Sequence, residues 1–339
     1  MCCNLNPDDT EKVRRLTEIR QRNNDFSWML CEYLNNNPCS ITKEWMKSIN
    51  SDGILSEETA YFALLTGLCG LDTDNNSRDR QLANDYFRPA VKKLNSKFYA
   101  GNPYYRDISI REEKSGDWEL THEKYNPYEA FIYNDIMMKP DFREIPCIGF
   151  FSENFQFPAV MEDGHEWMAI KPNEIETMQP VIDAIEGRIV TFGLGLGYFT
   201  YMASLKKKVE SVTVVERDNE VIQLFDDHIL PQFQHKEKVK VISADAFEYA
   251  EKQMPDKNFN YAFVDLWHDV SDGLDMYLKM KKIEPLSGQT KFLYWIEDSL
   301  LSAIRWQIFD RVIENAHSYT EVINHLSNPF LKKLAATIN

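Results

Sequence analysis

The sequence predicts an α/β protein whose C-terminal half is built on a parallel β-sheet, and three observations support this fold class. Short apolar runs alternate with helical segments between residues 188 and 296, which is typical of strands covered by helices. Straight after the first run, glycines occupy alternate positions: Gly193, Gly195 and Gly197. Acidic residues stand at or just after the ends of the next three runs: Glu216, Asp245 and Asp265. Because the carboxyl ends of parallel strands meet at one edge, we expect the glycines and the acids to share one rim.

The composition is that of an ordinary globular protein with an acidic balance. The chain has 339 residues, of which 43% are hydrophobic and 27% charged, and its formal net charge is -15. This length is sufficient for about two domains. A strongly negative chain repels phosphate backbones and anionic lipids, so we expect neither a nucleic-acid substrate nor a membrane partner.

The sequence carries no targeting or metal signature. No stretch approaches the roughly 18 to 20 consecutive apolar residues of a membrane span, and the polar start lacks the apolar run of a signal peptide. The six cysteines show no C-x-x-C spacing, which indicates reduced thiols instead of a zinc ribbon or a disulfide framework. We therefore expect a cytoplasmic protein without a metal site.

The region before the alternating segment falls into two parts. Residues 8–94 carry apolar side chains at three- and four-residue steps, which predicts helices. Between about 100 and 169 this periodicity disappears, and strand-like runs within 155–170 flank Asp163-Gly164, a dipeptide typical of tight hairpin turns. We predict three units: a mainly helical N-terminal domain at 1–145, a β-hairpin subdomain or linker at 146–171, and the parallel-sheet domain at 172–339.

The C-terminal domain begins with a helix after Lys171, with Pro172 in its first turn and Gly187 placed to end it. The glycine turn then follows the first strand. The remaining pattern predicts further strands at 212–215, 239–242, 261–264 and 291–296, and helices at 219–225, 246–253 and 273–282. Mostly helical segments at 299–316 and 321–336 complete the chain, so we expect five parallel strands and a helical tail.

The glycine turn limits the kind of ligand that the rim can bind. A dinucleotide fingerprint G-x-G-x-x-G requires its third glycine where Tyr198 stands, and no phosphate loop G-x-x-x-x-G-K-[ST] is present. Glu216, about twenty residues after the turn, offers acceptors for two ribose hydroxyls. The other rim acids suit a positive charge. The pattern therefore favours a nucleoside with a cationic tail.

Four features follow one another in order: the glycine turn, Glu216 ending the second strand, Ala244-Asp245-Ala246-Phe247 after the third, and Asp265 ending the fourth. Together they make residues 188–300 resemble the core of the class I, Rossmann-like S-adenosylmethionine-dependent methyltransferases. The resemblance implies that S-adenosylmethionine is the cofactor. It also implies the following roles: Gly193, Gly195 and Gly197 facing the methionine part, Glu216 the ribose, Asp245 and Ala246 the adenine, and Asp265 the methyl-transfer region.

Two features are shared with the spermidine synthase branch of the same fold. Thr191 stands two residues before the first glycine, where the wider family often has an acid, and a β-hairpin region precedes the core. However, the Asp-Ser-Ser-Asp-Pro signature of that branch is replaced by Asp265-Leu-Trp-His-Asp269. Aminopropyl transfer is therefore the alternative to methyl transfer.

Methyl transfer depends mainly on positioning and electrostatics, and it needs a base only if the acceptor must lose a proton. Asp265, His268 and Asp269, in the loop after the fourth strand, are the candidate catalytic residues. In the equally open alternative, Asp265 only holds the ligand and His268 is a solvated loop residue. Asn173 and Glu174 either reach the methionine end of the cofactor or cap a helix.

We therefore expect an S-adenosylmethionine-dependent methyltransferase that acts on a small-molecule or peptide-like acceptor. The alternatives are a spermidine synthase-like aminopropyltransferase and a non-catalytic interaction protein that retains the fold. The large helical region at 1–145 is the sequence feature that favours an interaction protein. The acceptor and the oligomeric state, a dimer included, are left open by the sequence.

Overall fold

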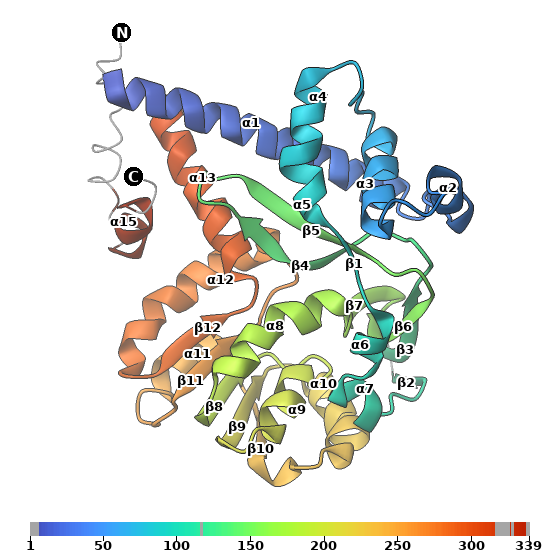
Figure 1. The fold of residues 1–339 in the computed structure, drawn as a ribbon. Helices are drawn as coiled ribbons and strands as arrows, with labels where there is room; N and C mark the ends of the chain where they lie inside the picture. The colour runs from blue at the N-terminus through green and yellow to red at the C-terminus, as the bar shows by residue number, and fades with distance from the viewer. Residues whose placement is uncertain (1–6, 116–117, 316–325, 327–328, 337–339) are drawn as a thin grey trace.

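The computed structural model describes residues 7–115, 118–315, 326 and 329–336. Its strands form a five-stranded parallel sheet, a four-stranded antiparallel sheet and a three-stranded mixed sheet. In Figure 1 the mixed sheet lies between the N-terminal helices and the parallel-sheet domain. Within the described ranges, every helix is too short or too polar to cross a membrane.

The five-stranded sheet forms the C-terminal domain, in the order β10-β9-β8-β11-β12 with every neighbouring pair parallel. Its strands are β8 (Gly187–Phe192), β9 (Val209–Glu216), β10 (Val239–Ser243), β11 (Tyr261–Val264) and β12 (Lys291–Tyr294). The strand order reverses between β8 and β11, which makes this a Rossmann-like sheet with its switch point there. The predicted fold class and the five parallel strands are confirmed.

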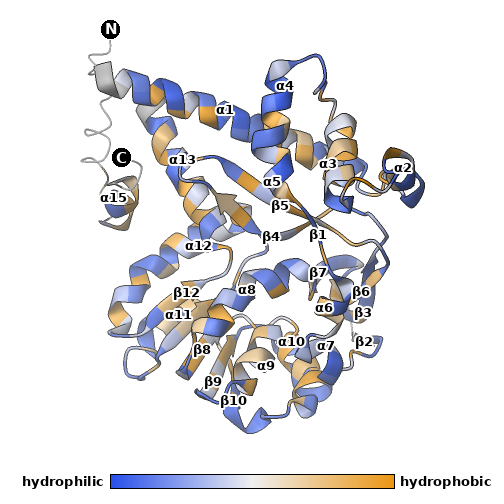
Figure 2. Cartoon of the chain, in the orientation of Figure 1, coloured by the Kyte–Doolittle hydropathy of each residue, from blue (hydrophilic) through white to orange (hydrophobic). Residues whose placement is uncertain are grey.

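Helices connect these strands, as the alternating pattern predicted. The helices are α8 (Pro172–Ala184) before β8, then α9 (Tyr198–Leu205), α10 (Asn219–Leu224), α11 (Ala246–Lys252) and α12 (Val270–Ile283). Shorter turns are η2 (Phe225–Ile229), η3 (Leu230–Gln232), η4 (Lys236–Lys238) and η5 (Glu284–Ser287). In β8 the side chains of Ile189, Val190 and Phe192 are fully buried, as expected of a covered parallel strand. Figure 2 shows the apolar colouring along this sheet.

The antiparallel sheet has the order β2-β3-β6-β7. Its strands are β2 (Glu113–Ser115), β3 (Trp118–Tyr125), β6 (Phe155–Glu162) and β7 (His165–Ala169). The turn between β6 and β7 is Asp163-Gly164, and both residues have positive φ angles of 50° and 78°, the conformation that a two-residue hairpin turn requires. The predicted hairpin is therefore confirmed. It does not stand alone, because β6 also pairs along its whole length with β3.

The mixed sheet consists of β1 (Val91–Lys93), β4 (Phe131–Met138) and β5 (Glu144–Phe150) in the order β1-β5-β4. Residues 1–145 thus contain β1 to β4 and the first residues of β5, besides the helices that were expected there. The mainly helical interpretation misses these strands because β3 and β4 pair with strands that come later in the chain. Local periodicity carries no information on such pairing. The boundaries at 145 and 171 remain a prediction.

The helices before the mixed sheet pack around a second apolar core. They are α1 (Pro7–Asn36), α2 (Lys43–Ile49), α3 (Glu57–Leu68), α4 (Ser77–Leu82), η1 (Ala83–Phe87) and α5 (Arg88–Ala90). The helices α6 (Ser96–Ala100) and α7 (Pro103–Asp107) follow β1 and pack in the core that includes the parallel sheet. Side chains cap several of them: Thr42 caps α2, Ser56 caps α3 and Asn76 caps α4. These caps satisfy backbone N–H groups that a helix start leaves free.

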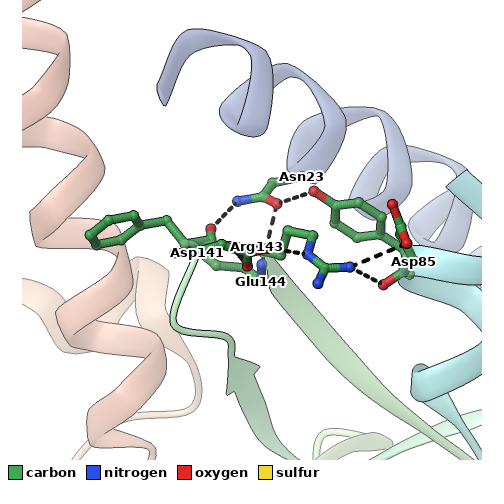
Figure 3. A network of polar contacts seen from close by, with 7 residues as sticks. Asn23, Asp85, Asp141, Arg143 and Glu144 are labelled. Atoms are coloured by element: carbon green, nitrogen blue, oxygen red, sulfur yellow. Dashed lines mark hydrogen bonds and ion pairs between the residues drawn. The ribbon is translucent and has the colours of Figure 1, made fainter. Parts of the chain in front are cut away.

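A polar network fastens α1 to the turn between β4 and β5 (Figure 3). The amide of the buried Asn23 donates to the Phe142 carbonyl at 3.0 Å and accepts from the Tyr86 hydroxyl at 2.8 Å and from the Glu144 N–H at 3.2 Å. Arg143 donates to Asp141 at 2.8 Å. Because a buried amide is costly unless its hydrogen bonds are made, this network fixes how the N-terminal helices sit on the mixed sheet.

The chain continues after β12 with α13 (Glu297–Asn315) and α15 (Pro329–Ala336). The helix α13 packs against α12 and β4 and so ties the parallel-sheet domain to the mixed sheet. The predicted helical tail is confirmed for the described residues. The predicted helical residues 316, 321–325 and 327–328 lie outside them.

Candidate functional site

A cleft of about 410 Å³ opens at the carboxyl ends of β8, β9, β10 and β11, beside the switch point of the sheet. We call its two sides the core wall and the hairpin wall. The core wall consists of residues that follow the strands: Gly193, Leu194, Gly195, Val215, Glu216, Arg217, Ala244, Asp245, Ala246, Phe247, Asp265, Leu266, Trp267, His268, Asp272, Met276 and Trp295. The hairpin wall comes from β7 and the start of α8: Glu166, Trp167, Met168, Ala169, Lys171 and Glu174.

The glycine turn is closely packed, and each of its glycines has a positive φ angle. A Cβ atom on Gly193 would lie 1.9 Å from the carbonyl oxygen of Asp265, and one on Gly197 would lie 2.4 Å from the ring of Phe225. Such distances leave no room for any side chain. Gly193 and Gly195 line the cleft as predicted, whereas Gly197 begins α9 and faces Phe225.

Two hydrogen-bond donors of the turn are already engaged by the protein. The N–H of Leu194 donates to Glu216 Oε2 at 3.2 Å, and the N–H of Leu196 donates to the Met168 Sδ atom at 3.2 Å. The other carboxylate oxygen of Glu216 accepts from the N–H groups of Arg217 and Asp218. Glu216 is thus held at the rim by the backbone, with its carboxylate beside the turn.

Asp245 and Ala246 stand at the start of α11, on the same rim. The Asp245 side chain is exposed and accepts from the Glu248 N–H at 2.9 Å, so it caps the helix. Ala246 is buried at 8% exposure. Next to them the ring of Phe247 lines the cleft, with the Lys279 ammonium 3.8 Å from its centroid. A flat apolar surface flanked by a carboxylate suits a heteroaromatic ring with an exocyclic amine.

Two carboxyl groups meet where the walls join. Glu174, from α8, is only 8% exposed, and Asp265 directly follows β11. Burial raises the pKa of Asp265 to about 7. Burial also raises the pKa of Glu174 well above its ordinary value, and the charge of Asp265 raises it further, while Lys171 lowers it. Because a negative charge on one of these two acids disfavours a negative charge on the other, the pair retains a proton near neutral pH.

The candidate residues in the loop after β11 differ in whether they line the cleft. His268 lines the cleft, and its Nδ1 lies 3.1 Å from an Asp272 carboxylate oxygen. Asp269 does not line the cleft; it begins α12 in a reciprocal capping box with Asp272. Burial alone would raise the pKa of Asp272, but hydrogen bonds from the backbone of Asp269 and from His268 lower it. Asp269 thus has a structural position at the start of α12.

The two candidate residues that precede the parallel-sheet core, Asn173 and Glu174, also differ in position. Glu174 lines the cleft, whereas Asn173, its neighbour in the first turn of α8, does not. The described contact of Asn173 is made by its carbonyl, which accepts from the Thr177 hydroxyl at 2.7 Å. The structure therefore brings together most of the predicted residues and leaves three outside the cleft lining: Asn173, Gly197 and Asp269.

The sequence analysis missed most of the hairpin wall. Trp167, which is 38% exposed, meets the ring of His268 edge to face, with their centroids 4.6 Å apart. Lys171 pairs with Glu166 at 2.5 Å. Met168 contacts the glycine turn as described above. A strand-like run after a hairpin turn was visible in the sequence, but nothing local indicated that it would lie against residues 193–196.

The charges of the cleft are predominantly negative. Six carboxyl groups line it: Glu166, Glu174, Glu216, Asp245, Asp265 and Asp272. Only two fixed positive charges accompany them, Lys171 and Arg217. Such a field attracts a cation and repels a pyrophosphate. Among the described residues, no group of three or more His, Cys, Asp and Glu side chains is arranged to hold a metal ion.

No protein-family model matches the chain, and no curated protein matches it either. Among solved structures, it is similar to the methyltransferase domain of bacterial CtHen1-C, at 15% identity over 26% of this chain and 47% of that one, with a TM-score of 0.23. It is also similar to spermidine synthase from Thermotoga maritima, at 14% identity over 51% and 52% of the two chains, with a TM-score of 0.30.

The chain spans about half the length of each of these two structures. Likenesses this weak carry no argument about this chain. The strand order of the sheet carries the fold assignment. At the level of the fold, the core is a Rossmann-like parallel sheet, as the sequence predicted.

Proposed function

We propose that this protein is an S-adenosylmethionine-dependent methyltransferase that acts on a small-molecule or peptide-like acceptor. The observation that carries the proposal is the acidic cleft at the switch point, with six carboxyl groups against two fixed positive charges. A nucleoside that bears a sulfonium matches this field, whereas a dinucleotide brings phosphates into it. The N–H groups of Leu194 and Leu196, which a phosphate would need, already have acceptors.

The residues present fit the adenosyl group and its cationic tail. Glu216 is held in place to accept from ribose hydroxyls, and Asp245 with Phe247 offers a carboxylate and a ring for the adenine. Gly193 and Gly195 line the cleft, so the cationic tail would run along their backbone. When bound, S-adenosylmethionine supplies an electrophilic methyl group on a positively charged sulfur.

The protein contributes to the reaction by positioning the acceptor, by stabilising a positive charge and by accepting a proton. Glu174 and Asp265 lie where the two walls meet, so a cationic ligand bound beside them would favour their ionised, negatively charged forms. Because the pKa of Asp265 is raised to about 7, its carboxylate is suited to take a proton from an acceptor near neutral pH. His268, on the same wall, is held by Asp272 and is the second candidate.

Aminopropyl transfer is the second candidate function, and one observation favours it. The hairpin precedes the core in sequence and forms a wall of the cleft, and Thr191 is buried where an acid would often stand. An aminopropyltransferase binds decarboxylated S-adenosylmethionine in preference to the carboxylated form. Competition between these two compounds for the cleft therefore distinguishes the two activities.

Titration calorimetry with S-adenosylmethionine tests the proposal. We expect micromolar binding to the wild type and binding about 10- to 100-fold weaker to Glu216→Ala, since a charge-assisted hydrogen bond contributes roughly 1.5–3 kcal/mol. Glu216→Gln retains one acceptor and should lie between them. A urea titration of each variant checks that the turn remains folded.

Binding of NAD in place of S-adenosylmethionine, or no heat with any adenosyl sulfonium, would contradict the proposal. The second of these outcomes, together with no turnover of candidate acceptors, is what a non-catalytic interaction protein predicts. A cytoplasmic location and the absence of a nucleic-acid substrate remain part of the proposal, and the acidic balance of the chain supports the second.

A further inference from the structure

Met168 occupies a position that neither the strand pattern nor the glycine turn explains. Its Sδ atom accepts a hydrogen bond from the N–H of Leu196 at 3.2 Å. The same atom would lie 2.0 Å from a Cβ on Gly195, so the thioether fills the space that this glycine leaves open. A flexible, polarisable side chain is well suited to fill such an irregular gap.

A second, small apolar pocket is lined in part by the two residues that Met168 contacts, Gly195 and Leu196. Its volume is about 20 Å³, and side chains from β3, β6, α10 and η2 line it, among them Trp118, Val160 and Phe225. It shares Trp167 and Gly195 with the cleft, and it also includes Leu196, the hydrogen-bond partner of Met168. Met168 lines the cleft, and its sulfur contacts Gly195 and Leu196 of the apolar pocket, so it lies where the two spaces adjoin.

We propose that Met168 determines specificity by limiting the size of the sulfur-bound group that lies along the glycine turn. This inference rests on the proposed function, in which the tail of an adenosyl compound runs along Gly193 and Gly195. With Met168 present, the cleft and the apolar pocket are separate, and a small sulfur substituent fits. Without its side chain, the cleft and the apolar pocket join, and a bulky apolar substituent gains a place.

Two variants separate the volume of Met168 from its sulfur. Met168→Ala removes the side chain and opens the boundary. Met168→Leu keeps nearly the same volume but has no acceptor for the Leu196 N–H. Amide hydrogen exchange at Leu196 should therefore become faster in both variants, whereas only Met168→Ala should gain space. Urea midpoints of both variants confirm that the hairpin remains folded.

Calorimetry with 5′-methylthioadenosine and 5′-benzylthioadenosine tests the size limit. We expect the benzyl compound to bind Met168→Ala at least about 10-fold more tightly than it binds the wild type or Met168→Leu. The methyl compound should bind all three proteins within about threefold. An unchanged ratio of the two affinities in Met168→Ala would overturn the proposal.

Benzene, followed by ligand-observed NMR, separates this proposal from the proposed function because it needs no nucleoside site. Binding of benzene to Met168→Ala, and not to the wild type or Met168→Leu, supports Met168 as the boundary. If neither thioadenosine binds any of the three proteins, the proposed function fails while the benzene result still decides the role of Met168. Equal benzene signals in all three proteins would overturn that role.

Discussion

The two walls of the cleft differ in how the sequence encodes them. The core wall comes from strand ends within one alternating segment, and its turn is so tightly packed that a Cβ on Gly193 would meet the Asp265 carbonyl at 1.9 Å. The hairpin wall comes from a sheet whose strands pair across long stretches of sequence, and it reaches the core through Met168 and Trp167. The core wall is therefore a rigid scaffold, whereas the hairpin wall packs against it with side chains that determine the shape of the site.

This difference predicts unequal responses to the same glycine substitution, which is the largest effect that we expect. Gly193→Ala combines a φ angle of 97° with a clash against backbone, so it should lower the free energy of unfolding by roughly 3–5 kcal/mol. Gly164→Ala, in the hairpin turn, has a φ angle of 78° but nothing within 4 Å of the new Cβ. Gly164→Ala should lower the free energy of unfolding by about 1–2 kcal/mol, because only the unfavourable φ angle of the new alanine contributes.

Urea denaturation of both variants and the wild type measures the two free energies. A Gly193→Ala protein as stable as Gly164→Ala would show that the glycine turn yields more easily than its packing indicates. The rigid description of the core wall would then be wrong.

The junction between the walls gives the second prediction, which concerns pH. Glu174 and Asp265 have raised pKa values in the folded protein, so the stability that they contribute is fully present below their unfolded pKa values of about 4. It is lost as the pH rises through the folded value of about 7 for Asp265. Glu174→Gln removes one of the two charges and should stabilise the protein at pH 8 by about 1–2 kcal/mol.

Unfolding free energies of the wild type and Glu174→Gln between pH 4 and pH 8 test this sign. The exposed Glu186, paired with Lys208 on the surface, provides the control Glu186→Gln, which should follow the wild-type curve. A Glu174→Gln curve parallel to the wild type would contradict the raised pKa of Glu174 in the folded protein.

The smallest expected effect concerns Asp269, on the loop of the core wall. Because it caps α12 and does not line the cleft, Asp269→Ala should cost about 1 kcal/mol of stability. Asp269→Asn keeps an acceptor and should cost less. Neither variant should change the affinity for S-adenosylmethionine by more than about twofold. A loss of methyl transfer in Asp269→Asn at unchanged stability would restore its catalytic assignment.

The sequence could predict the core wall because its signals are local. Strand, glycine turn and helix follow directly in the chain, and acids at strand ends must gather at one edge of a parallel sheet. Glu216, Asp245 and Asp265 therefore meet as predicted. Asp269 shows the limit of this reasoning, since an acid just before a helix is equally suited to cap it.

The hairpin wall could not be predicted in the same way. The turn at Asp163-Gly164 was evident, but the pairing of β6 with β3 depends on residues about 40 positions apart, beyond any periodic pattern. Nothing near Met168 indicated that its sulfur would fill the space at Gly195. Glu174 could be predicted in part. Its position just before the core is evident from the sequence, but its burial beside Asp265 depends on the packing of α8.

The central claim is that an adenosyl sulfonium lies between the two walls, and the most direct test is an experimental structure of the protein with S-adenosylmethionine. We predict the ribose hydroxyls within hydrogen-bond distance of Glu216, the adenine beside Asp245 and Phe247, and the sulfur between the glycine turn and the pair Glu174 and Asp265. An empty cleft at saturating ligand, or an adenosyl group bound elsewhere on the molecule, would contradict the claim.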